Sequence, residues 1–436
     1  MTGSEKPIVE DLMAFLDASP TPYHAVREVQ QRLEQRGFQR FDEREPFRLE
    51  AGTRGYVMRA GSVIAFRLGS APLPEAGFLV LGAHTDSPNL RLRPQPDVAS
   101  HGYTGLGAEV YGGVLLTTWL DRDLSLAGRV IFKGGDTALV RLPGALCRVP
   151  NLAIHLDRDV NRSGLVVNPQ TTLVPVLGRE RADSPTRVLE LCAEALDRSA
   201  PGEIVSFDLS LFDVQAASRG GRNGEFLFSA RLDNLASCHA ATEAFSQNVA
   251  TERSTFMALY DHEEVGSQSA VGARSAFLGQ ILERVVGATA GGGAEALARA
   301  VSRSLFVSLD MAHAVHPNFA DKHDKQHRPL LGEGPVIKIN TNQSYATDGP
   351  GQALFVEACQ AEGVKPQFFV ARNDIPCGST IGPIVAARLG LRTIDVGNPM
   401  LSMHSCREMA GAADHAAMVR VLGRLLTEAR ALDPSV

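Results

Sequence analysis

The sequence lacks the features that mark secreted and membrane-spanning proteins. It has only six cysteines in 436 residues, and no two of them are spaced as C-x-x-C, so neither a disulfide framework nor a paired-cysteine metal site is indicated. No apolar stretch reaches the roughly 20 residues of a membrane-spanning helix, and the first residues show no signal-peptide pattern. We therefore expect a soluble cytoplasmic protein whose cysteines are buried, reduced thiols.

Positive charge is also in short supply. The 43 Lys and Arg residues are outnumbered by 49 Asp and Glu residues, which gives a formal net charge of -6. Because binding to phosphate groups needs a basic surface, we expect no nucleic-acid partner. The hydrophobic content of 44% and the charged content of 21% are those of an ordinary globular protein. A chain of this length predicts two or three domains.

Hydrophobic periodicity predicts an α/β domain. Residues 7–37 show the helical spacing of apolar residues, interrupted by the Pro-rich break SPTP. The run GFLVLGAHTD, residues 77–86, is apolar along most of its length, as in a strand that is covered on both faces. From residue 229 onward, strand-like and helix-like segments alternate, which indicates a mainly parallel sheet. The Gly-rich stretch 291–301 is an exception that we predict to be a loop.

The middle of the chain has a different pattern. Residues 95–228 are rich in glycine and in short β-type runs, with one helix-like segment and an expected hairpin at KGGD, residues 133–136. We therefore predict two domains. Residues 1–94 and 229–436 form a discontinuous α/β domain, and residues 95–228 form a β-rich domain that is inserted into it.

Potential metal ligands gather at the ends of predicted strands. In open α/β sheets, ligands bind beyond the carboxyl ends of the strands. Five such ends carry acids or histidines, namely His84 with Asp86, Asp233, Glu263 with Glu264, Asp310, and His404. Each has an ordinary explanation alone, such as a helix N-cap for Asp233, but clustered carboxylates would repel one another unless a cation neutralised them. Two imidazoles and several carboxylates suit zinc or a similar divalent ion, so a hydrolytic metal site is predicted.

Long motifs in a fixed order extend over nearly the whole chain: AHTDSPNLRLRP, VYGG, TTWLDRDLSLAGRV, NLAIHL, SARLDNLASC, YDHEEVGSQSA, DMAHAVHPN, RNDIPCGSTIGPI and MHSCREMAG. In these motifs the chain resembles the aspartyl aminopeptidases, the M18 family of metallo-aminopeptidases. The resemblance implies a di-zinc exopeptidase fold with an inserted dimerisation domain, and dimers that assemble into a tetrahedral dodecamer. It also implies two zinc ions per subunit, with cobalt or manganese as possible substitutes, and peptide substrates that begin with Asp or Glu.

The resemblance also implies a role for each candidate residue. Asp233 would bridge both zinc ions, His84 and Asp310 would complete one zinc site, Glu264 and His404 would complete the other, Glu263 would be the general base, and Asp86 would hold His84 from behind. The two adjacent glutamates are then explained, because one binds metal while the other handles the proton. His262, just before them, receives no role from the resemblance.

Three further residues are expected near the substrate. The resemblance implies that His155, in NLAIHL, reaches the substrate from a neighbouring subunit; direct metal contact and an ordinary strand histidine are the alternatives. Lys338, in GPVIKIN, is unusual in an apolar strand because a buried ammonium group needs a partner. It either faces water on an edge strand or, as the resemblance implies, meets the carboxylate of an N-terminal Asp or Glu. Tyr345 is expected to line the same pocket or to steady the reacting oxygen.

The sequence leaves several alternatives open. The segment MAHAVHPNFADKHDKQH holds four histidines, which allow a third metal site, although a polar loop at an active-site or subunit boundary fits better: His313, His316, His323 and His327. The function also has two alternatives. One is a catalytically inactive assembly protein of the same fold, and the other is a related di-metal amide hydrolase such as a deacylase or carboxypeptidase.

Overall fold

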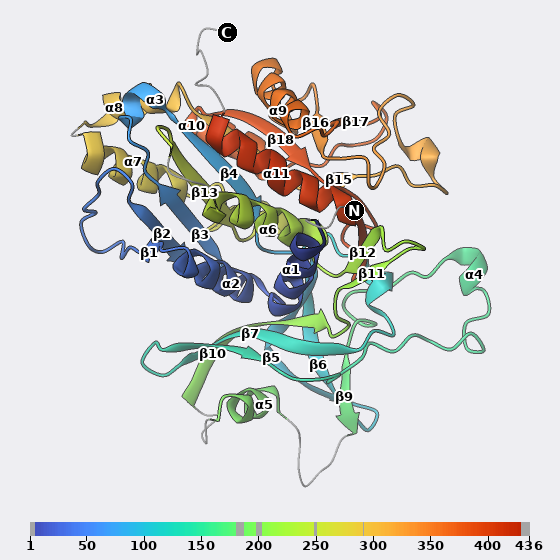
Figure 1. Ribbon diagram of the computed structural model, residues 1–436. Helices are drawn as coiled ribbons and strands as arrows, with labels where there is room; N and C mark the ends of the chain where they lie inside the picture. Colours follow the sequence, from blue (N-terminus) through green and yellow to red (C-terminus); the bar gives the residue numbers. More distant parts are fainter. Residues whose placement is uncertain (1–4, 180–186, 198–202, 248–250, 291, 429–436) are drawn as a thin grey trace. The chain divides into compact units, whose positions relative to one another are not determined.

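The computed structural model describes residues 5–179, 187–197, 203–247, 251–290 and 292–428, and its helices and strands are labelled in Figure 1. Contacts divide the chain into two compact units. The first unit comprises Met1–Asp86, Ala217–Met403 and Glu408–Val436, and the second comprises Ser87–Ala216 and His404–Arg407.

A nine-stranded sheet forms the centre of the first unit. In spatial order its strands are β1 (Gln39–Arg40), β2 (Arg54–Arg59), β3 (Ser62–Arg67), β13 (Ser254–Tyr260), β4 (Phe78–His84), β14 (Leu305–Leu309), β18 (Arg392–Gly397), β16 (Val336–Ile339) and β17 (Gln367–Val370). The four central strands, from β13 to β18, run parallel to one another, as do the outer pairs β1–β2 and β16–β17. Only β2–β3, β3–β13 and β16–β18 pair antiparallel. The predicted mainly parallel α/β sheet is therefore confirmed.

Helices cover both faces of this sheet (Figure 1). One layer is formed by α1 (Glu5–Ala18), α2 (Pro22–Gln35), α6 (Leu232–Gln247), α9 (Gly349–Ala361) and α11 (Ala412–Glu428). The other is formed by α3 (Leu73–Ala76), α7 (Phe277–Ala290), α8 (Ala294–Val301) and α10 (Ile381–Leu389). Along β4, Leu79 and Leu81 pack with the first layer while Phe78 and Val80 pack with the second, because successive side chains point to opposite faces. Both faces being buried explains why this strand is continuously apolar.

The prediction of a loop at residues 291–301 is wrong for most of these residues. Helix α8 occupies Ala294–Val301. Leu297 and Ala300 pack into the hydrophobic core that this helix layer forms with the sheet. The glycines that precede the helix concealed this short amphipathic pattern.

A second, five-stranded sheet belongs to the same unit and was not predicted. Its order is β11 (Ser218–Gly220), β12 (Phe226–Ser229), β20 (Glu408–Gly411), β19 (Pro399–Leu401) and β15 (Ala312–His313). Each strand has only two to four residues, and they come from three distant parts of the chain. Such short strands give almost no periodic signal.

The second unit is built on an antiparallel six-stranded sheet. Its strands, in spatial order, are β8 (Thr137–Arg141), β7 (Leu124–Phe132), β10 (Ile204–Asp213), β5 (Asn89–Ser100), β6 (Tyr103–Tyr111) and β9 (Val176–Arg179). The unit also contains η1 (Leu116–Trp119), α4 (Val160–Ser163) and α5 (Val188–Ala195). Strands β7 and β8 form the hairpin predicted at residues 133–136.

The limits of this unit differ from the predicted insert, residues 95–228. The unit begins earlier because Asn89–Leu92 already pair with β6. It ends earlier because β12 pairs with β20 of the first unit.

All six cysteines are free thiols, and five of them are buried, whereas Cys377 is half-buried. Among the helices described, none combines the length and apolar character that crossing a bilayer requires.

The close approach of β4 and β14 gives a test of the core. Gly82 lies where a Cβ atom would come within 2.1 Å of the buried Phe306 ring, so Gly82→Ala should lower the free energy of unfolding by about 1–3 kcal/mol. Gly287→Ala, at an exposed position of α7 with nothing within 4 Å, should instead raise it by about 0.5–1 kcal/mol. Urea unfolding of both variants measures the difference, and equal midpoints would contradict the packing described.

Candidate metal centre

The strand order brings three of the predicted site segments to one edge of the sheet. Strands β13, β4 and β14 are adjacent and parallel, so their carboxyl ends coincide. His84 is the last residue of β4, and Asp310 directly follows β14. Glu263 and Glu264 begin the short turn η3 (Glu263–Val265), which follows β13. The first unit therefore assembles these residues as the sequence predicted.

The side chains at this edge lie within reach of a shared cation. Nε2 of His84 is 3.6 Å from Oδ1 of Asp233 and 3.9 Å from Oε2 of Glu263. Ligand atoms of His84, Asp233 and Asp310 lie within 4.8 Å of one another, and so do those of His84, Glu263 and Glu264. This set of one imidazole and four carboxylates is the kind of donor set that zinc accepts.

The electrostatics of the cluster indicate that a positive charge belongs there. Burial raises the pKa of Glu263 to about 7, and the neighbouring acids Asp310, Asp86 and Asp233 add to the effect while His84 opposes it. Burial likewise raises the pKa values of Glu264 and Asp310. A divalent ion would reverse these shifts, because it favours ionised carboxylates.

His84 shows the opposite response to the same surroundings. Burial alone would lower its pKa, but the contact with Asp86 and the charges of Glu263 and Asp233 outweigh burial and raise the pKa well above its ordinary value. Without a metal, the protonated imidazole of His84 is therefore the cation that offsets the charge of the neighbouring carboxylates. A metal ligand has to be neutral imidazole, so an ion in this place would take over the role of that proton.

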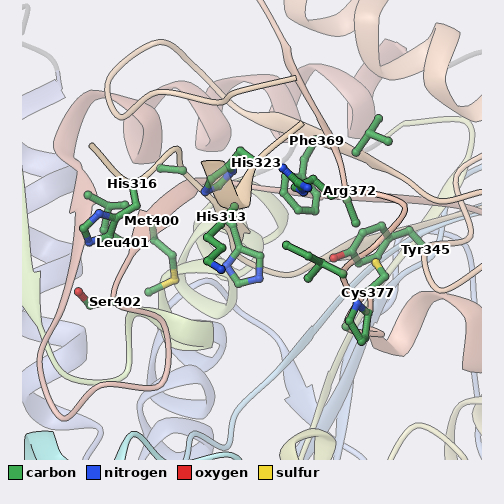
Figure 2. A pocket seen from close by; sticks show the side chains of 17 residues that line it. His313, His316, His323, Tyr345, Phe369, Arg372, Cys377, Met400, Leu401 and Ser402 are labelled. Atoms are coloured by element: carbon green, nitrogen blue, oxygen red, sulfur yellow. The ribbon is translucent and has the colours of Figure 1, made fainter. Parts of the chain in front are cut away.

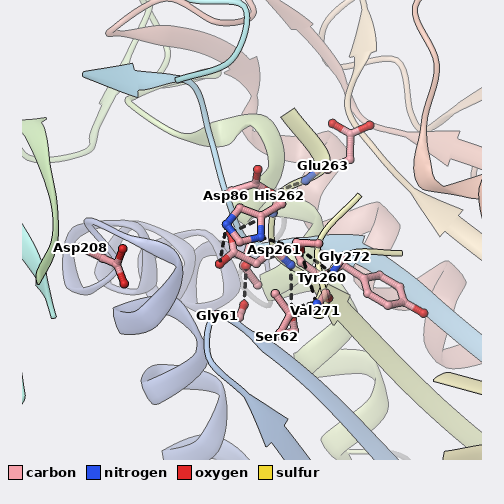
Figure 3. A network of polar contacts seen from close by, with 12 residues as sticks. Gly61, Ser62, Asp86, Asp208, Tyr260, Asp261, His262, Glu263, Val271 and Gly272 are labelled. Carbon is pink, nitrogen blue, oxygen red and sulfur yellow. Dashed lines mark hydrogen bonds and ion pairs between the residues drawn. The ribbon is translucent and has the colours of Figure 1, made fainter. Parts of the chain in front are cut away.

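Asp86 organises the turn that carries the two glutamates. Its Oδ1 accepts the backbone N–H of Glu263 at 3.1 Å (Figure 3). Its Oδ2 accepts the backbone N–H of Glu264, also at 3.1 Å. His262, which precedes the two glutamates, has a left-handed backbone (φ 68°). A backbone of this kind turns successive N–H groups toward one anion. Nδ1 of His84 lies 3.0 Å from the Asp86 backbone oxygen and 3.5 Å from Oδ1. Asp86 therefore contacts both the turn of Glu263 and Glu264 and the imidazole of His84.

His262 and the residues around it fix the other side of this turn. Nδ1 of His262 lies 2.8 Å from the Ser269 hydroxyl, and the His262 N–H donates to Asp261. The Asp261 N–H in turn donates to the Ser62 hydroxyl, which donates to the Val271 carbonyl (Figure 3). His262 therefore has a structural function that the sequence did not reveal.

Sequence reasoning also missed three residues that hold the ligands in place. Oε2 of Glu408 accepts the backbone N–H of Asp233 at 3.1 Å. Asn234 donates to the Leu309 carbonyl at 2.8 Å, and the thiol of Cys238 donates to the His84 carbonyl at 2.9 Å. These contacts join side chains to the backbone of distant segments, so no local pattern announces them. The backbone of Asp233 is itself non-helical, so Asp233 is more than an ordinary residue of α6.

Lys338 is buried beside the cluster. It is 2% exposed, and β16 lies between β17 and β18, so the alternative of a water-facing edge strand is wrong. Its Nζ donates to the Met311 carbonyl at 3.2 Å and is 3.5 Å from Oδ1 of Asp310. The same Nζ lies 5.0 Å from the ring centroid of Tyr345. The ammonium group therefore stands between a predicted metal ligand and an aromatic ring.

Tyr345 connects this lysine with a cavity of about 400 Å³. Figure 2 shows the cavity with Tyr345 and Cys377 on one side and the histidines of the 313–323 segment on the other. His313 and His323 make edge-on contacts with Phe369, at centroid distances of 5.7 and 6.5 Å. The segment is thus a polar and aromatic wall of the cavity.

The alternative of a third metal site in this segment finds no support. Among the described residues, its histidines form no group of three potential ligands within binding distance. His316 instead packs on Phe319, with ring centroids 4.9 Å apart. His327 pairs with Asp324, with Nδ1 2.7 Å from Oδ1.

The two remaining candidate site histidines, His155 and His404, belong to the second unit. His155 lies in an exposed turn closed by a hydrogen bond from Leu156 N–H to the Ala153 carbonyl, so the alternative of a strand histidine is wrong. Nδ1 of His404 lies 3.0 Å from the Gly113 carbonyl oxygen. The role of His404 as a metal ligand and that of His155 at the substrate of a neighbouring subunit stay predictions.

Comparison with known proteins gives a consistent result. Residues 15–424 match the model of the family described as Aminopeptidase I zinc metalloprotease (M18). A protein of Ectopseudomonas mendocina (strain ymp) named "Probable M18 family aminopeptidase 2" is 46% identical over 422 residues, which cover 95% of this chain and 97% of the relative. A protein of the same name from Streptomyces avermitilis is 46% identical over 409 residues, with 93% and 94% covered.

The fold also matches solved structures over nearly the whole chain. A chain of the Ape4 and Nbr1 complex superposes with a TM-score of 0.93 at 39% identity, covering 98% of this chain and 86% of that chain. The S. cerevisiae mApe1 dodecamer gives a TM-score of 0.84 at 30% identity, with 97% of each chain covered.

The cluster makes a prediction about metal content. Asp233→Ala should lose bound zinc, because Asp233 contributes to the group around His84 and is expected to serve two ions. Glu263→Gln is the matched control in the same cluster and should keep its zinc, since the amide preserves the shape of a residue that is not expected to be a ligand. Mass spectrometry of metals in the purified variants measures both, and full zinc occupancy in Asp233→Ala would contradict the assignment.

Proposed function

Because the chain belongs to the M18 family of zinc metallo-aminopeptidases, we propose that it is a di-zinc enzyme that removes N-terminal Asp or Glu residues from peptides. Family membership makes the chain a peptide-bond hydrolase and argues against a deacylase or a carboxypeptidase. No candidate ligand or base is replaced in the sequence, which argues against an inactive assembly protein. The observation that carries the acidic preference is the buried ammonium group of Lys338.

The proposed metal ligands follow the cluster and the family motifs. Asp233 would serve both zinc ions, His84 and Asp310 would complete one zinc site, and Glu264 and His404 would complete the other. The mutual distances of His84, Asp233 and Asp310 support the first set, whereas His404 is proposed from its motif MHSCREMAG alone. When bound, zinc supplies Lewis acidity that polarises the scissile carbonyl and favours ionisation of the attacking water. Cobalt or manganese accept similar ligands.

The chain's own residues then move the proton. Oε2 of Glu263 lies 3.9 Å from Nε2 of His84, which supports the proposal that Glu263 accepts a proton from the attacking water and returns it to the leaving amine. Asp86 keeps Glu263 in this position through the N–H contacts of the turn. Proton transfer of this kind contributes about 10²–10⁴-fold to rate.

Selection of an acidic side chain requires a local cation, because the metal cluster is itself rich in carboxylates. Lys338 is the buried cation next to the cluster. Its Nζ lies 3.5 Å from Oδ1 of Asp310, and in the proposed function this ammonium group would pair with the substrate carboxylate. Tyr345 borders both Lys338 and the cavity, so it is placed to line the path of that side chain.

We also propose that the protein works as a homo-oligomer, with the second unit as the dimerisation domain. His155 is flanked by Leu152, Ile154 and Leu156, whose exposed fractions are 59%, 46% and 75%. A contiguous apolar segment of this kind is typical of a surface that another protein covers. One relative of known structure is a dodecamer, which supports dimers assembled into a tetrahedral dodecamer here. The free thiols are consistent with the cytoplasmic location that we propose.

Lys338→Met tests the acidic preference. It should lower kcat/KM for Asp and Glu substrates by several tens-fold or more, because loss of a charge-assisted contact in a desolvated pocket costs about 2–5 kcal/mol. Substrates with N-terminal Ala or Leu should be spared. Lys322→Met, which removes another lysine of the cavity wall, is the control and should leave the preference intact. Equal loss on acidic and neutral substrates would show that Lys338 does not select the side chain.

Mixed oligomers test the contribution of His155. His155→Ala and Glu263→Gln should each be nearly inactive alone, because each lacks one group of a shared site. Oligomers refolded from both variants should recover part of the activity, since some sites then combine an intact His155 with an intact Glu263. Verified mixed oligomers without any recovery would indicate that each subunit carries a complete site.

A further inference from the structure

The backbone pairing of β16 with β18 ends next to Lys338. Strands β16 and β18 pair antiparallel through Val336↔Gly397 and Ile337↔Val396, and this register places Lys338 opposite Asp395. There the hydroxyl of Thr347 stands between the two backbones. It donates to the Lys338 carbonyl at 2.7 Å and accepts the Asp395 N–H at 3.0 Å. One side chain therefore replaces direct pairing where the ladder ends.

The Asp395 side chain fixes the same segment from its other side. Its Oδ2 accepts the Ala346 N–H and its Oδ1 accepts the Thr380 hydroxyl, both at 2.6 Å. Asp395 is 0% exposed and Thr380 is 2% exposed, so water does not compete for these bonds. Thr347 and Asp395, which we call the Thr347–Asp395 latch, thus hold the segment that begins with Tyr345.

The latch acts on Lys338 and Tyr345, the two residues that we propose to select the substrate side chain. It binds the backbone carbonyl of Lys338 and the N–H of Ala346, the neighbour of Tyr345. The Lys338 ammonium and the Tyr345 ring lie 5.0 Å apart. A backbone bridge from Thr347 to Thr393 also joins the Tyr345 segment to β18, whereas the Thr347 hydroxyl joins it to the backbone of Lys338 itself. The position of Lys338 relative to Tyr345 therefore depends in part on the latch.

We propose that Thr347 and Asp395 are positioning residues for selectivity toward acidic N-terminal residues; this inference rests on the role of Lys338 proposed above. Without the hydroxyl, the buried Lys338 carbonyl and Asp395 N–H lose their common partner, and buried backbone groups do not stay unpaired. The ends of β16 and β18 then rearrange, and the ammonium group moves. A charge-assisted contact with a substrate carboxylate depends strongly on such placement.

A purely structural role predicts a different result. In that case removal of the hydroxyl lowers stability and reduces turnover equally for every substrate. The positioning role predicts a selective loss, expressed mainly as a higher KM for acidic substrates.

The chain offers a closely matched control. Thr393 lies on the same strand β18, is 2% exposed, and donates its hydroxyl to the Leu391 carbonyl at 3.1 Å. It pairs with Thr347 only through the backbone. Thr393→Val therefore removes a buried hydroxyl from the same strand without touching the latch.

The experiment compares Thr347→Val, Thr347→Ser, Thr393→Val and Lys338→Met as full-length, zinc-loaded proteins. It measures kcat and KM on chromogenic Asp, Glu and Leu amides, inhibition by free aspartate and leucine, and the thermal midpoint. Thr347→Val should lower kcat/KM on acidic substrates by about tenfold or more and weaken aspartate inhibition, with Leu values changed by less than about twofold. Thr347→Ser should restore the preference, and Thr393→Val should keep it.

Each other outcome overturns one identified claim. If Lys338→Met keeps the acidic preference, the proposed function fails. If Lys338→Met loses it while Thr347→Val keeps it, or if Thr393→Val shows the same selective loss, the latch proposal fails. Should Thr347→Val not fold, Asp395→Asn replaces it with the same expected pattern. If neither variant folds while Thr393→Val does, the pair is required for the fold rather than for selectivity, and the proposal is overturned.

Discussion

Crowding of like charges at one edge of a sheet is the constraint on which the rest of the first unit depends. Parallel strands bring Glu263, Glu264 and Asp310 to one imidazole, His84, and the start of α6 adds the carboxylate of Asp233. Burial raises the pKa values of Glu263, Glu264 and Asp310, so the ionised cluster is costly without a cation. A site of this kind is explained by metal binding, and family membership identifies zinc as the metal of its relatives.

Residues on two sides of the cluster contact its charged groups. On one side, Asp86 orients His84 and the turn of Glu263 and Glu264 through backbone contacts. On the other side, Lys338 balances Asp310 from within the sheet. In the function proposed above, the first arrangement serves the proton transfer and the second supplies the cation for an acidic substrate side chain. Catalysis and selectivity would then depend on neighbouring parts of a single electrostatic arrangement.

The sequence predicted the features that depend on long, regular patterns. Continuously apolar strands such as β4 and β13 marked the sheet, and their ends marked His84 and the glutamate pair. The sequence did not predict the five-stranded sheet, because its strands are very short. It also missed the contact between Asp86 and the Glu263 turn, which joins residues 177 positions apart. Contacts of side chains with distant backbone groups leave no periodicity, so only the folded chain reveals them.

The central claim is that the acid cluster holds metal ions for hydrolysis at acidic N-termini. Its most direct test is turnover of chromogenic Asp, Glu, Ala and Leu amides by the purified oligomer, before chelation, after chelation and after zinc is restored. The account predicts turnover that favours Asp and Glu, disappears with the metal and returns with zinc. Turnover that persists in verified metal-free protein, or zinc-loaded protein that hydrolyses none of these amides, would contradict it.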